Sequence, residues 1–134
     1  MKIVEFAFPG PLRERLIAAI LTGEKTATTA LLLDYELDGE QLPRVGEPGS
    51  VVDSDGRPVA VIEYTEVTVV ALGEVDLDTA LDEGEGFASV AEWRVAHEEF
   101  WNGYIEELRE RVGDPCWRLT DETPVIVHRF RLIG

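Results

Sequence analysis

The segment from Gly23 to Thr29 combines an amine with several hydroxyl groups in a chain of 134 residues. It reads Gly-Glu-Lys-Thr-Ala-Thr-Thr, so that Lys25 is followed by four small residues, three of which are threonines. An amine beside hydroxyl groups can polarise a carbonyl, hold a phosphate or activate a hydroxyl nucleophile. The alternative is structural, with Gly23 as a helix cap, Lys25 as a solvated charge and the threonines as strand residues. Taken alone, the segment favours this structural alternative.

The segment is predicted to lie at a junction between a helix and a strand. Residues 12–21 carry apolar side chains at helical spacing, and Gly23 ends the helix. Residues 26–33, which are rich in threonine and leucine, predict a strand. The chain therefore changes direction at the residues that could do chemistry.

The geometry of this junction decides which hydroxyl can act with the lysine. Side chains alternate along a strand, so Lys25 and Thr28 point to opposite faces if the strand is already regular at the lysine. They converge if the chain is still turning at Lys25 or contains a bulge. If the strand is regular from Glu24, Thr29 is the hydroxyl on the lysine's side.

The remaining pattern predicts an α+β domain with a small, mostly closed β-sheet and helices packed around it. His97 lies on the apolar face of a long helix that begins at a capping box at Ser89, and it is expected to be a core or boundary residue. The predicted elements are, in order, a short strand within 3–8, a loop over 34–49, strands over 50–53 and 58–66, further β structure over 67–72, a short acidic helix over 76–83, a helix over 89–112 and a final strand over 124–133.

Composition limits the classes of partner. Twelve Lys and Arg residues against 27 Asp and Glu residues give a net charge of −15, which disfavours binding to extended DNA or RNA but is compatible with a small neutral ligand. One cysteine, Cys116, and two histidines provide no disulfide framework and no cluster typical of a zinc site, so neither a metal nor a cofactor is expected. The absence of a long apolar run and of a signal-like N-terminus predicts a cytoplasmic protein that does not enter a membrane.

Several short motifs are spread over nearly the whole chain. They are Leu21-Thr22-Gly23, Glu24-Lys25-Thr26-Ala27-Thr28-Thr29, Asp34-Tyr35-Glu36, Leu42-Pro43-Arg44-Val45-Gly46, Asp55-Gly56-Arg57-Pro58, Thr65-Glu66-Val67, Glu83-Gly84-Glu85-Gly86, Ala91-Glu92-Trp93-Arg94 and His97. Together these motifs resemble the ASCH domain family, and the resemblance implies a single domain over residues 1–134 with a PUA-like β-barrel and flanking helices.

The resemblance also implies a function connected with RNA or nucleosides. ASCH domains were proposed as RNA-binding modules because they resemble the PUA domain. One bacterial branch is an amidohydrolase that removes the acetyl group from N(4)-acetylcytidine, and another member is a metal-independent ribonuclease. The lysine, threonine and glutamate proposed as catalytic in the amidohydrolase branch fall on Lys25, Thr28 and Glu85.

These residue types suit deacylation. Lys25 could act as a base in its neutral form or, when charged, as the donor to the developing oxyanion. Thr28 could be the nucleophile or position a water. Glu85, between two glycines, could carry a proton to the leaving amine, or it could be a solvated acid in an acidic turn. The residues that the matching motifs imply for substrate binding are Thr26, Thr29, Tyr35 and Arg94.

We therefore expect a metal-independent amidohydrolase acting on N(4)-acetylcytidine or a similar modified nucleoside. The alternatives are a non-catalytic RNA-binding module and a metal-independent ribonuclease. Both alternatives must engage a phosphate backbone, which the net charge opposes unless arginines gather in one cleft; the candidates are Arg44, Arg94, Arg118, Arg129 and Arg131. Replacing Lys25 with alanine is expected to abolish deacylation without unfolding the domain.

Overall fold

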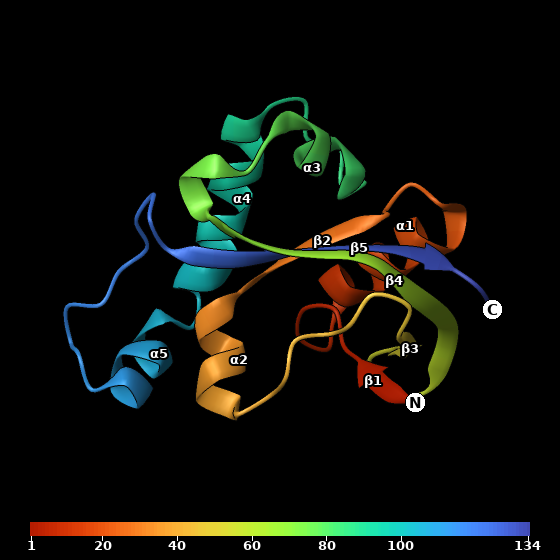
Figure 1. Cartoon of the computed structure of the whole chain (residues 1–134), viewed down its shortest axis with the longest axis horizontal. Helices are drawn as coiled ribbons and strands as arrows, with labels where there is room; N and C mark the ends of the chain where they lie inside the picture. Colours follow the sequence, from red (N-terminus) through yellow and green to blue (C-terminus); the bar gives the residue numbers. More distant parts are fainter.

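A five-stranded sheet forms the centre of the computed structural model, which describes all 134 residues (Figure 1). The strands are β1 (Lys2–Val4), β2 (Ala27–Leu31), β3 (Pro48–Val52), β4 (Pro58–Ala71) and β5 (Pro124–Leu132). The helices are α1 (Pro11–Thr22), α2 (Leu32–Asp38), the 3-10 turn η1 (Leu72–Glu74), α3 (Leu77–Asp82), α4 (Val90–Asn102) and α5 (Ile105–Val112). In the view of Figure 1, α3 lies above the central strands, and α2 and α5 lie below them.

The sheet is open, with the strand order β1-β3-β4-β5-β2. The β1–β3 pair is parallel, and the other pairs are antiparallel. The predicted α+β class is therefore confirmed, whereas closure into a PUA-like barrel is not. Closure would require the two edge strands to pair, but β1 pairs only with β3 and β2 pairs only with β5.

Two apolar clusters pack against opposite faces of this sheet. One surrounds α1 and includes Ile17 and Ile20 together with Phe130 of β5. The other lies under α4 and includes Trp93 together with Val125 of β5. Val125 and Phe130 are five positions apart on one strand, and side chains alternate along a strand, so they belong to different faces. None of the helices has the length and apolar composition required to cross a lipid bilayer.

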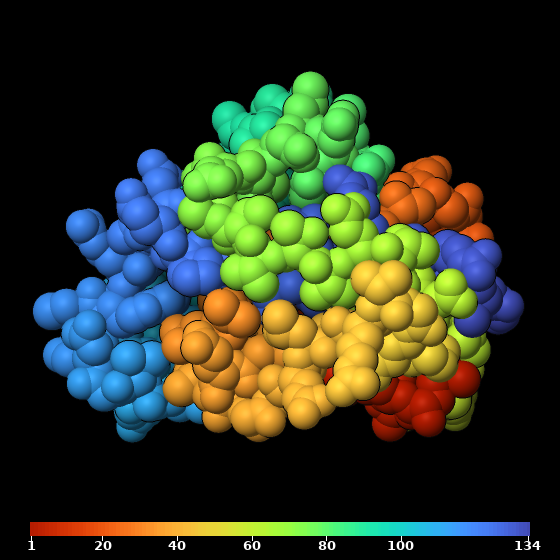
Figure 2. All heavy atoms as spheres, in the orientation of Figure 1, coloured from red at the N-terminus to blue at the C-terminus, as the bar shows by residue number.

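Most predicted elements are confirmed, with two corrections. The segment predicted as a loop over 34–49 begins inside α2, and only the part after Gly39 is irregular; Figure 2 shows it, in orange to yellow, on the surface beside β4. The helix predicted over 89–112 is two helices, because the chain breaks at Gly103 and Tyr104. Glycine is a weak helix former, and the backbone angle φ of Tyr104 is −128°, which is not helical.

Gly84 lies in the turn after α3 and packs against the backbone that leads into β2. Its φ is +68°, and a Cβ at this position would lie 2.4 Å from the carbonyl oxygen of Glu24 and 2.5 Å from the amide nitrogen of Lys25. Close by, the amide of Thr26 donates to the carbonyl of Asp82 at 2.8 Å. The glycine therefore allows two segments that are distant in sequence to touch through their backbones.

Replacing Gly84 with alanine should lower the free energy of unfolding far more than the same change at Gly113. Both glycines have a positive φ, which costs about 1–2 kcal/mol for a residue with a side chain. A Cβ at Gly84 would collide with backbone atoms, whereas nothing lies within 4 Å of the Cβ position at Gly113. Moving that backbone to make room for the Cβ adds about 1–3 kcal/mol to the loss at Gly84. Urea denaturation of both variants measures the difference, and equal losses would contradict the close approach.

Candidate functional site

Lys25 is buried, with only 1% of its side chain exposed. Its backbone amide donates to the carbonyl of Ala19 at the end of α1, which keeps the chain turning before β2 begins. Its Nζ lies within reach of four oxygen atoms: the Ala27 carbonyl at 2.9 Å, the carbonyl and Oε1 of Glu83 at 3.2 Å each, and Oε2 of Glu85 at 3.5 Å. The structural alternative of a solvated charge is therefore wrong for this lysine.

Glu83 is the second member of this group and is also 1% exposed. Its Oε2 accepts hydrogen bonds from the Thr29 hydroxyl at 2.9 Å and from Nε1 of Trp93 at 2.6 Å. Nε2 of His97 lies 3.3 Å from the same oxygen, while Nδ1 of His97 donates to the Trp93 carbonyl at 2.8 Å. One carboxylate thus connects the end of α3, strand β2 and the first turns of α4.

The two carboxylates beside Lys25 have pKa values that move in opposite directions. Burial alone would raise the pKa of Glu83, but the charge of Lys25 and the hydrogen bonds from His97 and Trp93 lower it below its ordinary value. Burial raises the pKa of Glu85, and the nearby charge of Glu83 adds to this effect, while Lys25 opposes it. The pKa values of the two carboxylates are thereby moved apart, a pattern typical of catalytic pairs.

A groove of about 1560 Å³ passes over these residues. Lys25, Glu83, Glu85 and His97 line it on one side. Its wall also contains a cluster of three aromatic rings. The ring centroid of Phe8 lies 5.6 Å from the ring centroids of Phe100, on which it stacks, and of Tyr104, which it meets edge-on. The charged group is therefore at the wall of a space large enough for a nucleoside.

The two candidate threonines have different surroundings. Thr29 donates to Glu83 and so belongs to the network of the lysine, although the chain is still turning at Lys25 and the strand begins only at Ala27. Thr28 points the other way, lies opposite His128 in the β2–β5 register and lines the groove. Its hydroxyl has no hydrogen-bond partner in the protein, so it is available to a ligand. Both Lys25 and Thr28 line the same groove, although they belong to opposite sides of the strand.

The residues expected to bind substrate are divided by the structure. Tyr35 lines the groove, and its hydroxyl lies 3.4 Å from Nε2 of His128. Thr26 and Arg94 do not line the groove. Thr26 is exposed and lies over the Asp82 carbonyl, while Arg94 pairs with Glu98 and, at 3.0 Å, with Asp121.

Sequence reasoning overlooked Glu83, Trp93 and His97 as members of the site. Glu83 and Glu85 both flank Gly84, and the sequence offered no reason to prefer the inner acid. Trp93 and His97 are four residues apart on one helical face, and their rings stack with centroids 4.1 Å apart. The spacing alone indicated a row of core residues. It could not show that a buried carboxylate, that of Glu83, lies against Trp93 and His97.

The site also contains a set of potential metal ligands. Atoms of Glu83, Glu85 and His97 lie within 4.8 Å of one another. Both carboxylates, however, already face the ammonium group of Lys25. A divalent cation placed between them would meet a buried positive charge, so this donor set does not fit a metal site as it stands.

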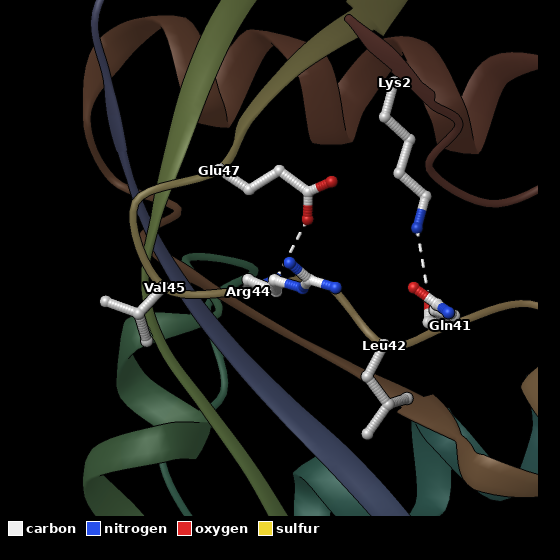
Figure 3. A pocket seen from close by; sticks show the side chains of 6 residues that line it. All are labelled: Lys2, Gln41, Leu42, Arg44, Val45 and Glu47. Atoms are coloured by element: carbon white, nitrogen blue, oxygen red, sulfur yellow. Dashed lines mark hydrogen bonds between the residues drawn. The ribbon is translucent and has the colours of Figure 1, made fainter.

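A second pocket, of about 420 Å³, lies between β1 and the segment before β3 (Figure 3). Its polar contacts are the bond from Nζ of Lys2 to the Gln41 carbonyl at 3.2 Å and the bond from the Arg44 amide to Glu47 at 2.9 Å. It shares no lining residue with the groove. Arg44 is thus remote from the groove wall that carries Lys25.

The other candidate arginines do not gather in one cleft either. Arg129 pairs with Asp82 and Glu66, and Arg131 pairs with Glu63. None of these arginines lines the groove. The positive cleft that polynucleotide binding requires is therefore not formed by this set.

Comparisons with known proteins agree with the fold. A family model described as ASCH domain matches residues 5–134. A solved ASCH domain from Lactobacillus crispatus JV V101 is 27% identical, with a TM-score of 0.80, over 98% of this chain and 78% of that chain. A protein of Enterococcus faecalis V583 from the DUF984 family is 22% identical, with a TM-score of 0.81, over 99% and 76%. A mutant ASCH protein from Zymomonas mobilis is 8% identical, with a TM-score of 0.58, over 98% and 73%. No match was found among curated proteins.

The buried ion pair corrects the expectation that Lys25→Ala leaves the domain folded. Removing the lysine leaves the Glu83 carboxylate buried without its cation, and losing one partner of a buried pair costs about 3–5 kcal/mol. We therefore expect Lys25→Ala to lower the free energy of unfolding by an amount of this order, measured by urea denaturation. A loss below about 1 kcal/mol would contradict this role of the pair.

The pH dependence of stability should separate the two carboxylates. Because the pKa of Glu83 is lowered on folding, its contribution is present above the ordinary glutamate value of about 4.3 and is lost as the pH falls through the folded-state value. Glu83→Gln should therefore be least stable, relative to the unmodified protein, near neutral pH, and the difference should shrink in acid.

Glu85→Gln is the matched control. Since the pKa of Glu85 is raised on folding, ionised Glu85 lowers the free energy of unfolding. Relative to the unmodified protein, Glu85→Gln should therefore be most stable near neutral pH, and this advantage should shrink in acid. Parallel curves for the two variants would contradict the assignment.

Proposed function

The chain belongs to the ASCH domain family, and we propose that it is an amidohydrolase that removes the acyl group from N(4)-acetylcytidine or a similar acylated nucleoside without a metal ion. The observation that carries the proposal is the position of Lys25. Its amine is buried at a groove wall between two carboxylates whose pKa values are moved in opposite directions. Amide hydrolysis needs an oxyanion donor and a proton for the leaving nitrogen, and this group supplies both.

Lys25 acts as the oxyanion donor. An ammonium group has three protons, whereas four oxygen atoms surround Nζ, and the longest of these contacts is the 3.5 Å one to Glu85. Glu85 is also the more exposed of the two acids, at 23%. The carbonyl oxygen of the substrate therefore replaces Glu85 at Nζ, while Glu83 keeps the amine charged and in place.

Glu85 is the proton donor to the leaving amine. In the reaction, the Glu85 carboxylate takes the proton of the attacking hydroxyl as its oxygen bonds to the acyl carbon, and it returns this proton to the nitrogen as the C–N bond breaks. Thr28 is the attacking hydroxyl or positions a water that attacks, since its hydroxyl faces the groove without a protein partner. If Thr28 attacks, water then releases the acyl group as the acid; either route consumes one water per amide.

Electrostatics favours a small substrate over a polynucleotide. The net charge is −15, and Arg94, Arg129 and Arg131 are paired with acids. A neutral nucleoside is not repelled by such a surface, whereas a phosphate backbone is. The aromatic rings in the groove wall offer flat apolar area of the kind that nucleobases stack on.

The deciding experiment is an assay of the purified protein with N(4)-acetylcytidine and, separately, with single-stranded RNA, each with and without a chelator. The expected result is release of cytidine that survives the chelator. RNA cleavage without deacylation would replace the proposal with a ribonuclease, and tight RNA binding with neither activity would replace it with a binding module.

Two neighbouring threonines provide a matched pair of variants. Thr28→Ala should lower kcat for deacylation by about 10²-fold or more, with little loss of stability, since the hydroxyl bonds to nothing in the protein. Thr29→Ala should instead lower the free energy of unfolding by about 1–3 kcal/mol, because buried Glu83 loses a hydrogen-bond donor. Kinetics and urea denaturation of both variants test this division, and loss of kcat in Thr29→Ala alone would reverse the two roles.

A further inference from the structure

His128 is a buried histidine in the groove wall that the proposed mechanism does not use. It is 3% exposed and lies on β5 directly opposite Thr28 of β2. Residues opposite each other on antiparallel strands place their side chains on the same face, about 4.5–5.5 Å apart at Cβ. The imidazole is therefore a neighbour of the hydroxyl proposed to act on the acyl group.

The hydrogen-bonding capacity of His128 is poorly used inside the protein. Its Nδ1 is buried and makes no hydrogen bond of normal geometry, its Nε2 has the long 3.4 Å contact with the Tyr35 hydroxyl, and the ring also approaches the backbone of Thr28. Burial lowers the pKa of His128 to about 4, so the ring is neutral at pH 7 and carries one donor and one acceptor. An unsatisfied buried polar atom costs about 1–3 kcal/mol and calls for an explanation.

The rings around His128 fit a flat ligand. The centroid of Tyr35 lies 6.0 Å from that of the imidazole, and both residues line the groove. Burial raises the pKa of Tyr35 to about 12, so its phenol keeps its proton at neutral pH and can donate. The imidazole also packs against Tyr64, with centroids 5.8 Å apart.

We propose that Tyr35 and His128 form the subsite that receives the heteroaromatic ring of the substrate, a pyrimidine nucleobase, and that both side chains hydrogen-bond to its polar edge. This inference rests on the proposed function, because it names the part of the substrate that the groove recognises. A ligand edge with both carbonyl and amine groups takes the place of the long Tyr35–His128 bond. The imidazole has no strong hydrogen bond at either nitrogen, so a ligand with donor and acceptor groups offers it better partners than the protein does. The position opposite Thr28 then places the exocyclic amide of the base beside the attacking hydroxyl.

The subsite is tested by binding of cytidine, the deacylated nucleoside, which separates recognition from turnover. Isothermal titration of the unmodified protein should show binding. His128→Phe keeps a flat ring without hydrogen-bonding atoms and should weaken binding at least tenfold, and Tyr35→Phe should weaken it about threefold or more. His128→Gln, which retains donor and acceptor groups, should restore part of the loss. Tyr64→Phe is the matched control: it removes a phenolic hydroxyl that makes no bond to His128, and the affinity should stay within twofold.

The outcomes distinguish the subsite from the activity. If the protein deacylates N(4)-acetylcytidine but His128→Phe and Tyr35→Phe bind cytidine within twofold of the unmodified protein, the subsite is wrong and the proposed hydrolase stands. Absence of cytidine binding by the unmodified protein also overturns the subsite, whatever the activity. Circular dichroism checks folding; should His128→Phe fail to fold, the comparison of Tyr35→Phe with Tyr64→Phe decides the question.

Discussion

The burial of one ammonium group beside one carboxylate is the constraint on which this molecule depends. An ionised group inside a protein is tolerated only if it is paired and hydrogen-bonded, and Lys25 and Glu83 are each 1% exposed. To satisfy Glu83, the fold must bring together the hydroxyl of Thr29, the indole of Trp93 and the imidazole of His97. Strand β2, the end of α3 and helix α4 therefore meet at a single point because the charges require it.

The same group separates residues that hold the site from residues that face a ligand. Glu83 accepts hydrogen bonds from Lys25 and from Thr29, so both Glu83 and Thr29 have their partners within the protein. Glu85 and Thr28 have weak or no internal partners and line the groove. Lys25 contacts both groups. Its shorter contacts, to Ala27 and Glu83, hold the fold, and its longest contact, to Glu85, is the one that the proposed substrate replaces. Stability and chemistry are thus connected through one side chain, and a variant at Lys25 changes both.

The sequence predicted part of this arrangement for identifiable physical reasons. The alternation of side chains left Thr28 and Thr29 as alternatives; the helix end at Gly23 favoured Thr28, but it is Thr29 that joins the network of Lys25. Family resemblance singled out Lys25 and Glu85, whose charged atoms lie 3.5 Å apart. Glu83 was not predicted, because burial of an acid depends on partners from β2 and α4 that only the folded chain assembles. The break at Gly103 and the open edges of the sheet are likewise long-range outcomes, since single-sequence patterns do not specify which strands fail to pair.

The place of β2 in the strand order has a consequence for how the protein loses its native state. As an edge strand, β2 is hydrogen-bonded on one side only, so its detachment breaks fewer ladder bonds than that of β4 or β5. Edge elements open by local fluctuations below the energy of global unfolding, and their amides exchange with solvent first. The buried ion pair of Lys25 and Glu83, just before β2, stabilises the strand against this opening. In this protein an edge strand carries Thr28 and directly follows the segment of Lys25, so the integrity of the groove depends on a local equilibrium as well as on the stability of the whole domain.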